Sequence, residues 1–265
     1  MEEGSFSGSE GRIFYRIWPA AGDPQRIVVL VHGYAEHGGR YAHVAEVLAA
    51  QGAVVCAPDH IGHGHSDGKR ALIVDFEHVV DDLHTLVTTT RDRYPDLPVV
   101  MAGHSMGGLL TGRYAERYPG DLAGVAFLGA VLGDWHWARD VLEHGIPEES
   151  SDPAGMSRDE LTVAEYAADP LVYHGTYQRP LLEAEVAALD RFNAELDRIT
   201  MPVMFLHGDS DPFVPYETSM AAVKQMPTKD LTVRVYPGAR HELVNELNRE
   251  EVIDALATFV RRVTA

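Results

Sequence analysis

Residues 103–107 read Gly-His-Ser-Met-Gly, a Gly-x-Ser-x-Gly pattern in which Ser105 could act as a nucleophile. The apolar run 98–102 precedes this pattern, and the run 106–118, which has the pattern of a helix, follows it. A strand, a tight turn and a helix in this order lift one serine hydroxyl off the sheet and present it to a substrate. Glycines are expected at both ends because side chains there would collide with the neighbouring strand and helix. The pattern predicts a catalytic serine, and an ordinary turn serine is the simpler alternative.

A serine hydroxyl needs a base that takes its proton and a carboxylate that orients the base. With a serine in this type of turn, the acid and then the base are expected further along the chain. Asp211 follows the apolar run 201–206, and His241 follows a later alternating run, so both come just after predicted strands. The carboxyl ends of parallel strands share one edge of a sheet, where ligands bind. We therefore predict a Ser105–His241–Asp211 triad, with Asp209 as the alternative acid.

Acyl transfer also needs two fixed N–H donors for the charge that develops on the carbonyl oxygen. The residue after the nucleophile, Met106, is expected to supply one backbone N–H. The second is expected from the loop that follows the apolar run 27–31, and Tyr34 N–H is the best placed. A plain strand-to-helix connection is the alternative interpretation of this loop.

Several segments, well separated along the chain, carry recognisable motifs: 32–41, 59–68, 103–108, and Tyr166 with 169–172. Together with Asp211 and His241, they resemble the corresponding motifs of the monoacylglycerol lipases, and the similarity runs from about residue 12 to 262. The resemblance implies an α/β-hydrolase fold, a mobile cap over the site, and hydrolysis of glycerol monoesters of fatty acids.

The same resemblance implies that Glu36 and Arg40 bind the substrate by ordering its glycerol end. A salt bridge that holds the oxyanion loop is the alternative role for this pair. Ala35 stands where the family has glycine, which matters if the position takes a positive φ. Val244 stands where some members have a histidine that helps to hold the alcohol. These departures bear on substrate preference and leave the predicted triad intact.

Strand and helix patterns alternate along most of the chain, which predicts an α/β fold with a mostly parallel sheet covered by helices on both faces. An early antiparallel strand is expected at 12–18, and further strands near 26–31, 53–57, 98–103, 123–130, 201–207 and 231–236. Helices are expected near 40–51, 75–93, 106–118, 216–226 and 248–262.

Residues 131–199 break this alternation with acidic residues interspersed with tryptophans and aliphatic side chains. We expect an inserted cap there, between the core segments 1–130 and 200–265. A helical excursion packed on the core is the alternative, and the two are compatible because a cap must itself dock.

The chain has 265 residues and a net charge of −18, which argues against nucleic acid as a partner and allows at most transient contact with anionic lipid surfaces. Its single cysteine, Cys56, lies in an apolar run and is expected to be a buried, inert thiol. The histidines His60, His63 and His65 are expected to be hydrogen-bonded loop residues rather than zinc ligands. We expect a soluble, cytoplasmic protein that needs no metal or organic cofactor.

The sequence therefore predicts a serine ester hydrolase that cleaves monoacylglycerols to fatty acid and glycerol through an acyl-enzyme. A broad carboxylesterase or lysophospholipase is one alternative, because the triad and fold do not fix the acyl group. An aminopeptidase or amidase on the same fold is another. A non-catalytic receptor for an acyl ligand is the alternative outside enzymes.

Overall fold

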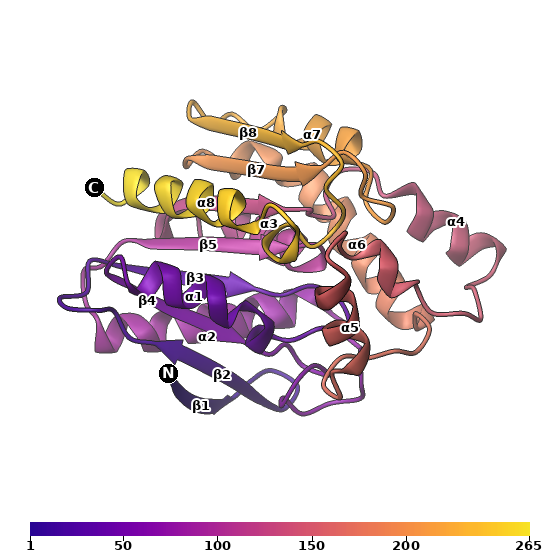
Figure 1. The fold of residues 1–265 in the computed structure, drawn as a ribbon, viewed down its shortest axis with the longest axis horizontal. Helices are drawn as coiled ribbons and strands as arrows, with labels where there is room; N and C mark the ends of the chain where they lie inside the picture. The colour runs from indigo at the N-terminus through magenta and orange to yellow at the C-terminus, as the bar shows by residue number, and fades with distance from the viewer.

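A single eight-stranded sheet organises the protein, which is described over residues 1–265 by a computed structural model (Figure 1). The strand order is β1-β2-β4-β3-β5-β6-β7-β8. Strand β2 runs antiparallel to both its neighbours, and all other pairs are parallel. The strands are β1 (Glu2–Ser7), β2 (Arg12–Trp18), β3 (Arg26–Val31), β4 (Ala53–Pro58), β5 (Val99–His104), β6 (Leu122–Leu128), β7 (Val203–Gly208) and β8 (Leu231–Tyr236). The predicted mostly parallel sheet with an early antiparallel strand is confirmed.

Helices cover both faces of this sheet. They are α1 (Ala42–Ala49), α2 (Phe76–Arg93), α3 (Met106–Arg117), α4 (His136–His144), α5 (Glu160–Ala168), α6 (Arg179–Glu195), α7 (Tyr216–Val223) and α8 (Arg249–Val263). Val28 and Leu30 of β3 belong to the core beneath α1 and α8, whereas Ile27 and Val29 belong to the core beneath α2, α3 and α6. Because both faces are buried, the central strands are apolar in near-continuous runs rather than at alternate positions. No helix is both long enough and apolar enough to cross a membrane.

Strand β1 is the element that the sequence did not predict. It pairs antiparallel with β2 along its whole length, from Glu2 opposite Ile17 to Ser7 opposite Arg12. Most of its side chains are exposed or half-buried, and Phe6 is its only large apolar residue. Backbone hydrogen bonds therefore hold this edge strand, and they leave no hydrophobic signature in the sequence.

The predicted cap, 131–199, contains helices α4, α5 and α6. Figure 1 shows α4 and α5 beyond the carboxyl ends of the parallel strands, where the arrowheads point. Helix α6 instead packs against α3, and a side chain on Gly112 of α3 would meet the ring of Phe192 of α6 at 2.6 Å. One part of the insertion thus covers the edge of the sheet, and α6 is built into the core.

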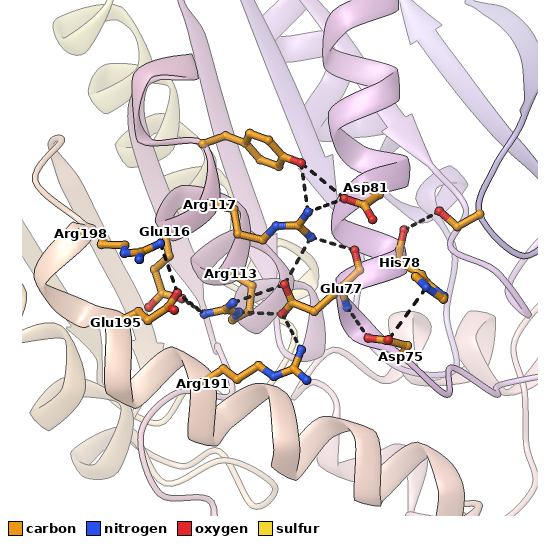
Figure 2. A network of polar contacts seen from close by, with 12 residues as sticks. Asp75, Glu77, His78, Asp81, Arg113, Glu116, Arg117, Arg191, Glu195 and Arg198 are labelled. Atoms are coloured by element: carbon orange, nitrogen blue, oxygen red, sulfur yellow. Dashed lines mark hydrogen bonds and ion pairs between the residues drawn. The ribbon is translucent and has the colours of Figure 1, made fainter.

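A network of ion pairs around a buried arginine joins α6 to α2 and α3 (Figure 2). Arg113 of α3 lies at its centre and donates to Glu77 of α2 at 2.9 Å, to Glu116 at 2.6 Å and to Glu195 of α6 at 3.0 Å. The Arg113 side chain is only 4% exposed. One guanidinium therefore binds acidic side chains from three helices, including the helix that leads back from the cap.

Cys56 lies on the central strand β4 and is fully buried. Its Sγ lies 3.5 Å from the hydroxyl of Thr90. Burial raises the pKa of the Cys56 thiol to about 11, so it stays protonated at neutral pH. The expectation of a buried, inert thiol is confirmed by this environment.

We expect Arg113→Ala to lower the free energy of unfolding by about 3 kcal/mol, because it removes a buried guanidinium and leaves the buried Glu116 without its partner. Arg198→Ala is the matched control: Arg198 pairs with the same Glu195 but is 54% exposed, so its loss should cost less than about 1 kcal/mol. Urea unfolding followed by circular dichroism measures both. Equal effects of the two substitutions would contradict the central role of Arg113.

Candidate active site

Ser105 occupies a strained turn between β5 and α3. Its backbone has φ 53° and ψ −123°, a conformation that costs a residue with a side chain about 1–3 kcal/mol. A Cβ on Gly103 would lie 2.2 Å from the carbonyl oxygen of Gly107, and one on Gly107 would lie 2.2 Å from that of Val31. The turn is therefore possible only with glycine at both positions, as the sequence predicted. It projects Ser105 beyond the carboxyl end of β5.

Asp211 and His241 come from the loops after β7 and β8 and meet there. The Nδ1 of His241 lies 2.7 Å from Oδ2 of Asp211 and donates to it. The other carboxylate oxygen accepts from the backbone N–H groups of Phe213 and Val214 at 2.9 and 3.1 Å. The carboxylate is thus fixed on both sides, and it holds the imidazole in the tautomer whose Nε2 can accept a proton.

The alternative acid, Asp209, has a different role. Its Oδ1 accepts from the backbone N–H of Gly238 at 2.6 Å and from the hydroxyl of Ser210 at 3.0 Å. Asp209 therefore closes the loop that leads to His241, and it makes no hydrogen bond to the imidazole.

The charge state of His241 depends on several carboxylates. Burial favours the neutral ring, but Asp211, Glu242 and Glu36 outweigh it and raise the pKa of His241 above its ordinary value. Burial likewise opposes ionisation of Asp211, yet His241 and the backbone donors lower its pKa. The pair is therefore arranged to stabilise an imidazolium once the ring has taken a proton.

Ser105 and His241 line the same cavity, and the ring of His104 beside the serine lies 4.6 Å from that of His241. The structure contains no hydrogen bond between the Ser105 hydroxyl and the imidazole. Such bonds are often long without substrate and tighten in the reactive complex. A serine hydroxyl and an imidazole oriented by a buried carboxylate thus meet at one cavity, an arrangement that acyl transfer requires.

Tyr34 and Met106, the predicted oxyanion donors, also line this cavity, and neither backbone N–H donates to another protein group. The loop that carries Tyr34 is held by Glu36, whose Oε1 accepts from Gly33 N–H at 2.8 Å. Ala35 has φ 68° and is buried, so this position does require the left-handed conformation that glycine tolerates best.

Glu36 and Arg40 are joined by a third residue, Glu242, which the sequence analysis did not identify. Arg40 donates to Glu36 at 2.9 Å and to both oxygens of Glu242 at 2.5 and 2.8 Å. Glu36 and Glu242 line the cavity, whereas Arg40 lies behind them. Because the partners are 202 residues apart, the only sequence signal for Glu242 was its position directly after His241. The geometry supports the salt-bridge alternative for Arg40.

The loop histidines make hydrogen bonds to the backbone. The side chain of His60 donates to the carbonyl of His32 at 3.1 Å, and that of His63 donates to the carbonyl of Ile61 at 2.9 Å. Burial lowers the pKa of His60 to about 3 and that of His63 to about 4, so both rings are neutral. These two fulfil the expectation of hydrogen-bonded loop residues, while the ring of His65 packs on Phe14.

Side chains from the cap region form much of the wall of this cavity. These side chains are Trp135, Met156, Tyr166, Tyr173, Tyr177 and Glu185. A second groove shares Trp135 and Tyr177 and continues to Ile146 and Pro147. A polar reaction centre thus opens into an aromatic and aliphatic space suited to an acyl chain.

Comparison with known proteins extends over nearly the whole chain. A family model described as serine aminopeptidase, S33, matches residues 22–248. The monoacylglycerol lipase of Mycolicibacterium smegmatis is 37% identical, over 97% of this chain and 96% of that protein. The crystal structure of Paleococcus ferrophilus monoacylglycerol lipase is 28% identical over 95% of this chain and 99% of its own, with a TM-score of 0.82. A thermostable carboxyl esterase from Bacillus coagulans, solved with glycerol, is 26% identical over 100% and 99%, with a TM-score of 0.87.

We expect Asp211→Asn to lower kcat for ester hydrolysis about 10⁴-fold, because the amide favours the wrong imidazole tautomer. Asp209→Asn should stay within about threefold of the parent, since Asp209 makes no hydrogen bond to His241 and an amide oxygen can still accept from Gly238 N–H. Steady-state kinetics on a p-nitrophenyl ester compare the two. A larger loss of kcat in the Asp209 variant than in the Asp211 variant would show that the assignment of Asp211 as the acid is wrong.

The acid limb of the pH profile should respond to Glu242. Only neutral His241 can act as a base, so kcat/KM falls as pH drops through its raised pKa. Glu242→Gln removes a negative charge that stabilises the imidazolium, so it should lower this pKa and move the acid limb to lower pH. The exposed Glu250→Gln on α8 is the control and should leave the profile unchanged. A shift of the limb to higher pH in the Glu242 variant would contradict this electrostatic account.

Proposed function

The chain belongs to the monoacylglycerol lipase family of the α/β-hydrolase superfamily, and on this premise we propose that it hydrolyses monoacylglycerols to a fatty acid and glycerol. The observation that carries the proposal is the buried Asp211–His241 pair, which faces the same cavity as the strained Ser105. The neighbouring carboxyl esterase solved with glycerol supports glycerol as the leaving alcohol.

In the first half of the proposed reaction, His241 takes the proton of Ser105 as the hydroxyl attacks the ester carbonyl. Asp211 compensates the charge of the imidazolium that forms. The N–H groups of Tyr34 and Met106 donate to the carbonyl oxygen as it becomes negative. His241 then gives its proton to the glycerol oxygen, the C–O bond breaks, and Ser105 carries the acyl group.

In the second half, water takes the place of glycerol. His241 removes one proton from the water, whose oxygen attacks the acyl-enzyme, and the same two N–H groups stabilise the second oxyanion. Proton return to Ser105 frees the fatty acid and restores the resting enzyme. The residues named here complete both halves without further groups.

Glu36 acts in this proposal chiefly through the loop that it holds. It binds Gly33 N–H and the hydroxyl of Tyr41, at 2.8 and 2.7 Å, and so fixes the direction of the next N–H, that of Tyr34. Since Glu36 and Glu242 also reach the cavity wall beside His241, they can accept hydrogen bonds from the glycerol hydroxyls. Arg40 pairs with both carboxylates from behind and compensates one of their two charges.

The description of the matching family model favours one competing activity, cleavage of aminoacyl amides. An aminopeptidase needs a carboxylate to bind the substrate ammonium group. Apart from Asp211, the carboxylates beside His241 are Glu36 and Glu242, and both are paired with the single Arg40. Because Arg40 compensates one of their two charges and engages their oxygens, it weakens this wall as a binding site for an ammonium group.

Fluorophosphonate should label the native protein and fail to label Ser105→Ala, which should also lose ester turnover by at least about 10³-fold. On the native protein, kcat/KM should be higher for monoacylglycerols than for p-nitrophenyl acetate or aminoacyl amides. Faster cleavage of the amides would identify an aminopeptidase instead. Labelling of Ser105→Ala, or unchanged turnover by it, would exclude the proposed nucleophile.

A further inference from the structure

Glu185 is a buried acid that the proposed reaction does not use. It lies on α6, is 1% exposed and lines the cavity that contains Ser105. Its carboxyl group makes no hydrogen bond to any protein group, and its Oε2 is fully enclosed. A buried, unpartnered carboxyl destabilises the folded state relative to an aliphatic side chain of similar size. Helix α6 therefore retains at the cavity wall a polar group that no protein contact satisfies.

Two tyrosine hydroxyls accompany this carboxyl. The hydroxyl of Tyr34 is also enclosed without a hydrogen-bond partner, and the ring of Tyr177 stacks on that of Tyr34 at 4.3 Å. Burial, with the nearby Glu185, raises the pKa of both phenols, so they remain hydrogen-bond donors. Burial alone raises the pKa of Glu185 to about 8, so its carboxyl is neutral at pH 7 and can both donate and accept.

This neutral group is separate from the charged carboxylates of the cavity. Glu36 and Glu242 are paired with Arg40, whereas no charged residue perturbs Glu185. The leaving alcohol must lie within reach of His241, next to Glu242, so it occupies the charged wall. The acyl chain departs from the same carbonyl carbon toward the remaining wall, which is formed by the aromatic side chains and Glu185.

Resting on the proposed ester hydrolysis, we propose that Glu185, with the hydroxyls of Tyr34 and Tyr177, binds an oxygen substituent on the acyl chain of the substrate. A hydroxyl group there would satisfy donors and acceptors that the protein leaves free. A plain alkyl chain would leave these donors and acceptors buried and unpaired. The free-energy cost of burying unpaired polar groups is how a polar subsite discriminates against a substrate that lacks the matching group. The preferred substrates are then glycerol monoesters of hydroxylated or otherwise oxygenated acids.

The test compares the glycerol monoester of octanoate with monoesters whose chain has a hydroxyl near the carboxyl, in the middle or at the far end. For the native enzyme, kcat/KM should be about tenfold higher for at least one hydroxylated ester than for the plain ester. Glu185→Leu should abolish this preference while plain-ester turnover is retained or raised. Glu185→Gln, which can still donate and accept, should keep most of it.

Glu183→Leu on the same helix is the matched control, because its side chain is 56% exposed; it should leave the preference intact. No preference in the native enzyme, or equal loss of plain and hydroxylated esters in Glu185→Leu, would overturn the inference. If Glu185→Leu instead changed the ratio of kcat/KM for the glycerol ester of octanoate to that for its propyl ester, Glu185 would bind the alcohol part of the substrate. That result would also overturn the inference. If the native enzyme cleaves no glycerol ester, the proposed function fails, and p-nitrophenyl esters of the same acids test the subsite independently.

Discussion

The absence of two side chains beside Ser105 is the constraint on which the rest of the site depends. Any Cβ at Gly103 or Gly107 would lie 2.2 Å from a backbone oxygen, so the chain could not pass from β5 into α3 at this angle. The sheet then does the remaining positioning, because its parallel strands end at one edge and deliver Asp211 and His241 from two later loops. The strained turn at Ser105 and the common edge of the parallel strands thus together position the side chains of Ser105, Asp211 and His241.

Two kinds of polar environment share the cavity. On one wall, Arg40 locks Glu36 and Glu242 into a charged cluster that also supports the oxyanion loop and raises the pKa of His241. On the other, Glu185 stands uncharged among aromatic rings. Burial has opposite outcomes in the two places because only one of them supplies a compensating cation. The two walls therefore differ in charge, as the proposed separation of a polyol end from an acyl end requires.

The sequence predicted the elements that follow from periodicity and from local motifs. The central strands and the turn at Ser105 each rest on a few consecutive residues. Strand β1 was not predicted because backbone pairing is its main support and it carries only one large apolar residue, and Glu242 was not predicted because its partner lies 202 residues away. Glu185 did leave a signal: it lies four residues after Leu181 and four before Leu189, on the apolar stripe of α6. An acid in such a stripe is either paired, neutral or functional.

The isolation of Cys56 has a practical consequence. It is the only cysteine, it lies at the centre of the sheet with no exposed surface, and its thiolate is suppressed. A maleimide dye will therefore react only with a cysteine that the experimenter adds, and the native residue need not be removed first. A single engineered thiol on α4 or α5 becomes a clean spectroscopic reporter, whose fluorescence can follow how those helices move while an ester enters and its products leave.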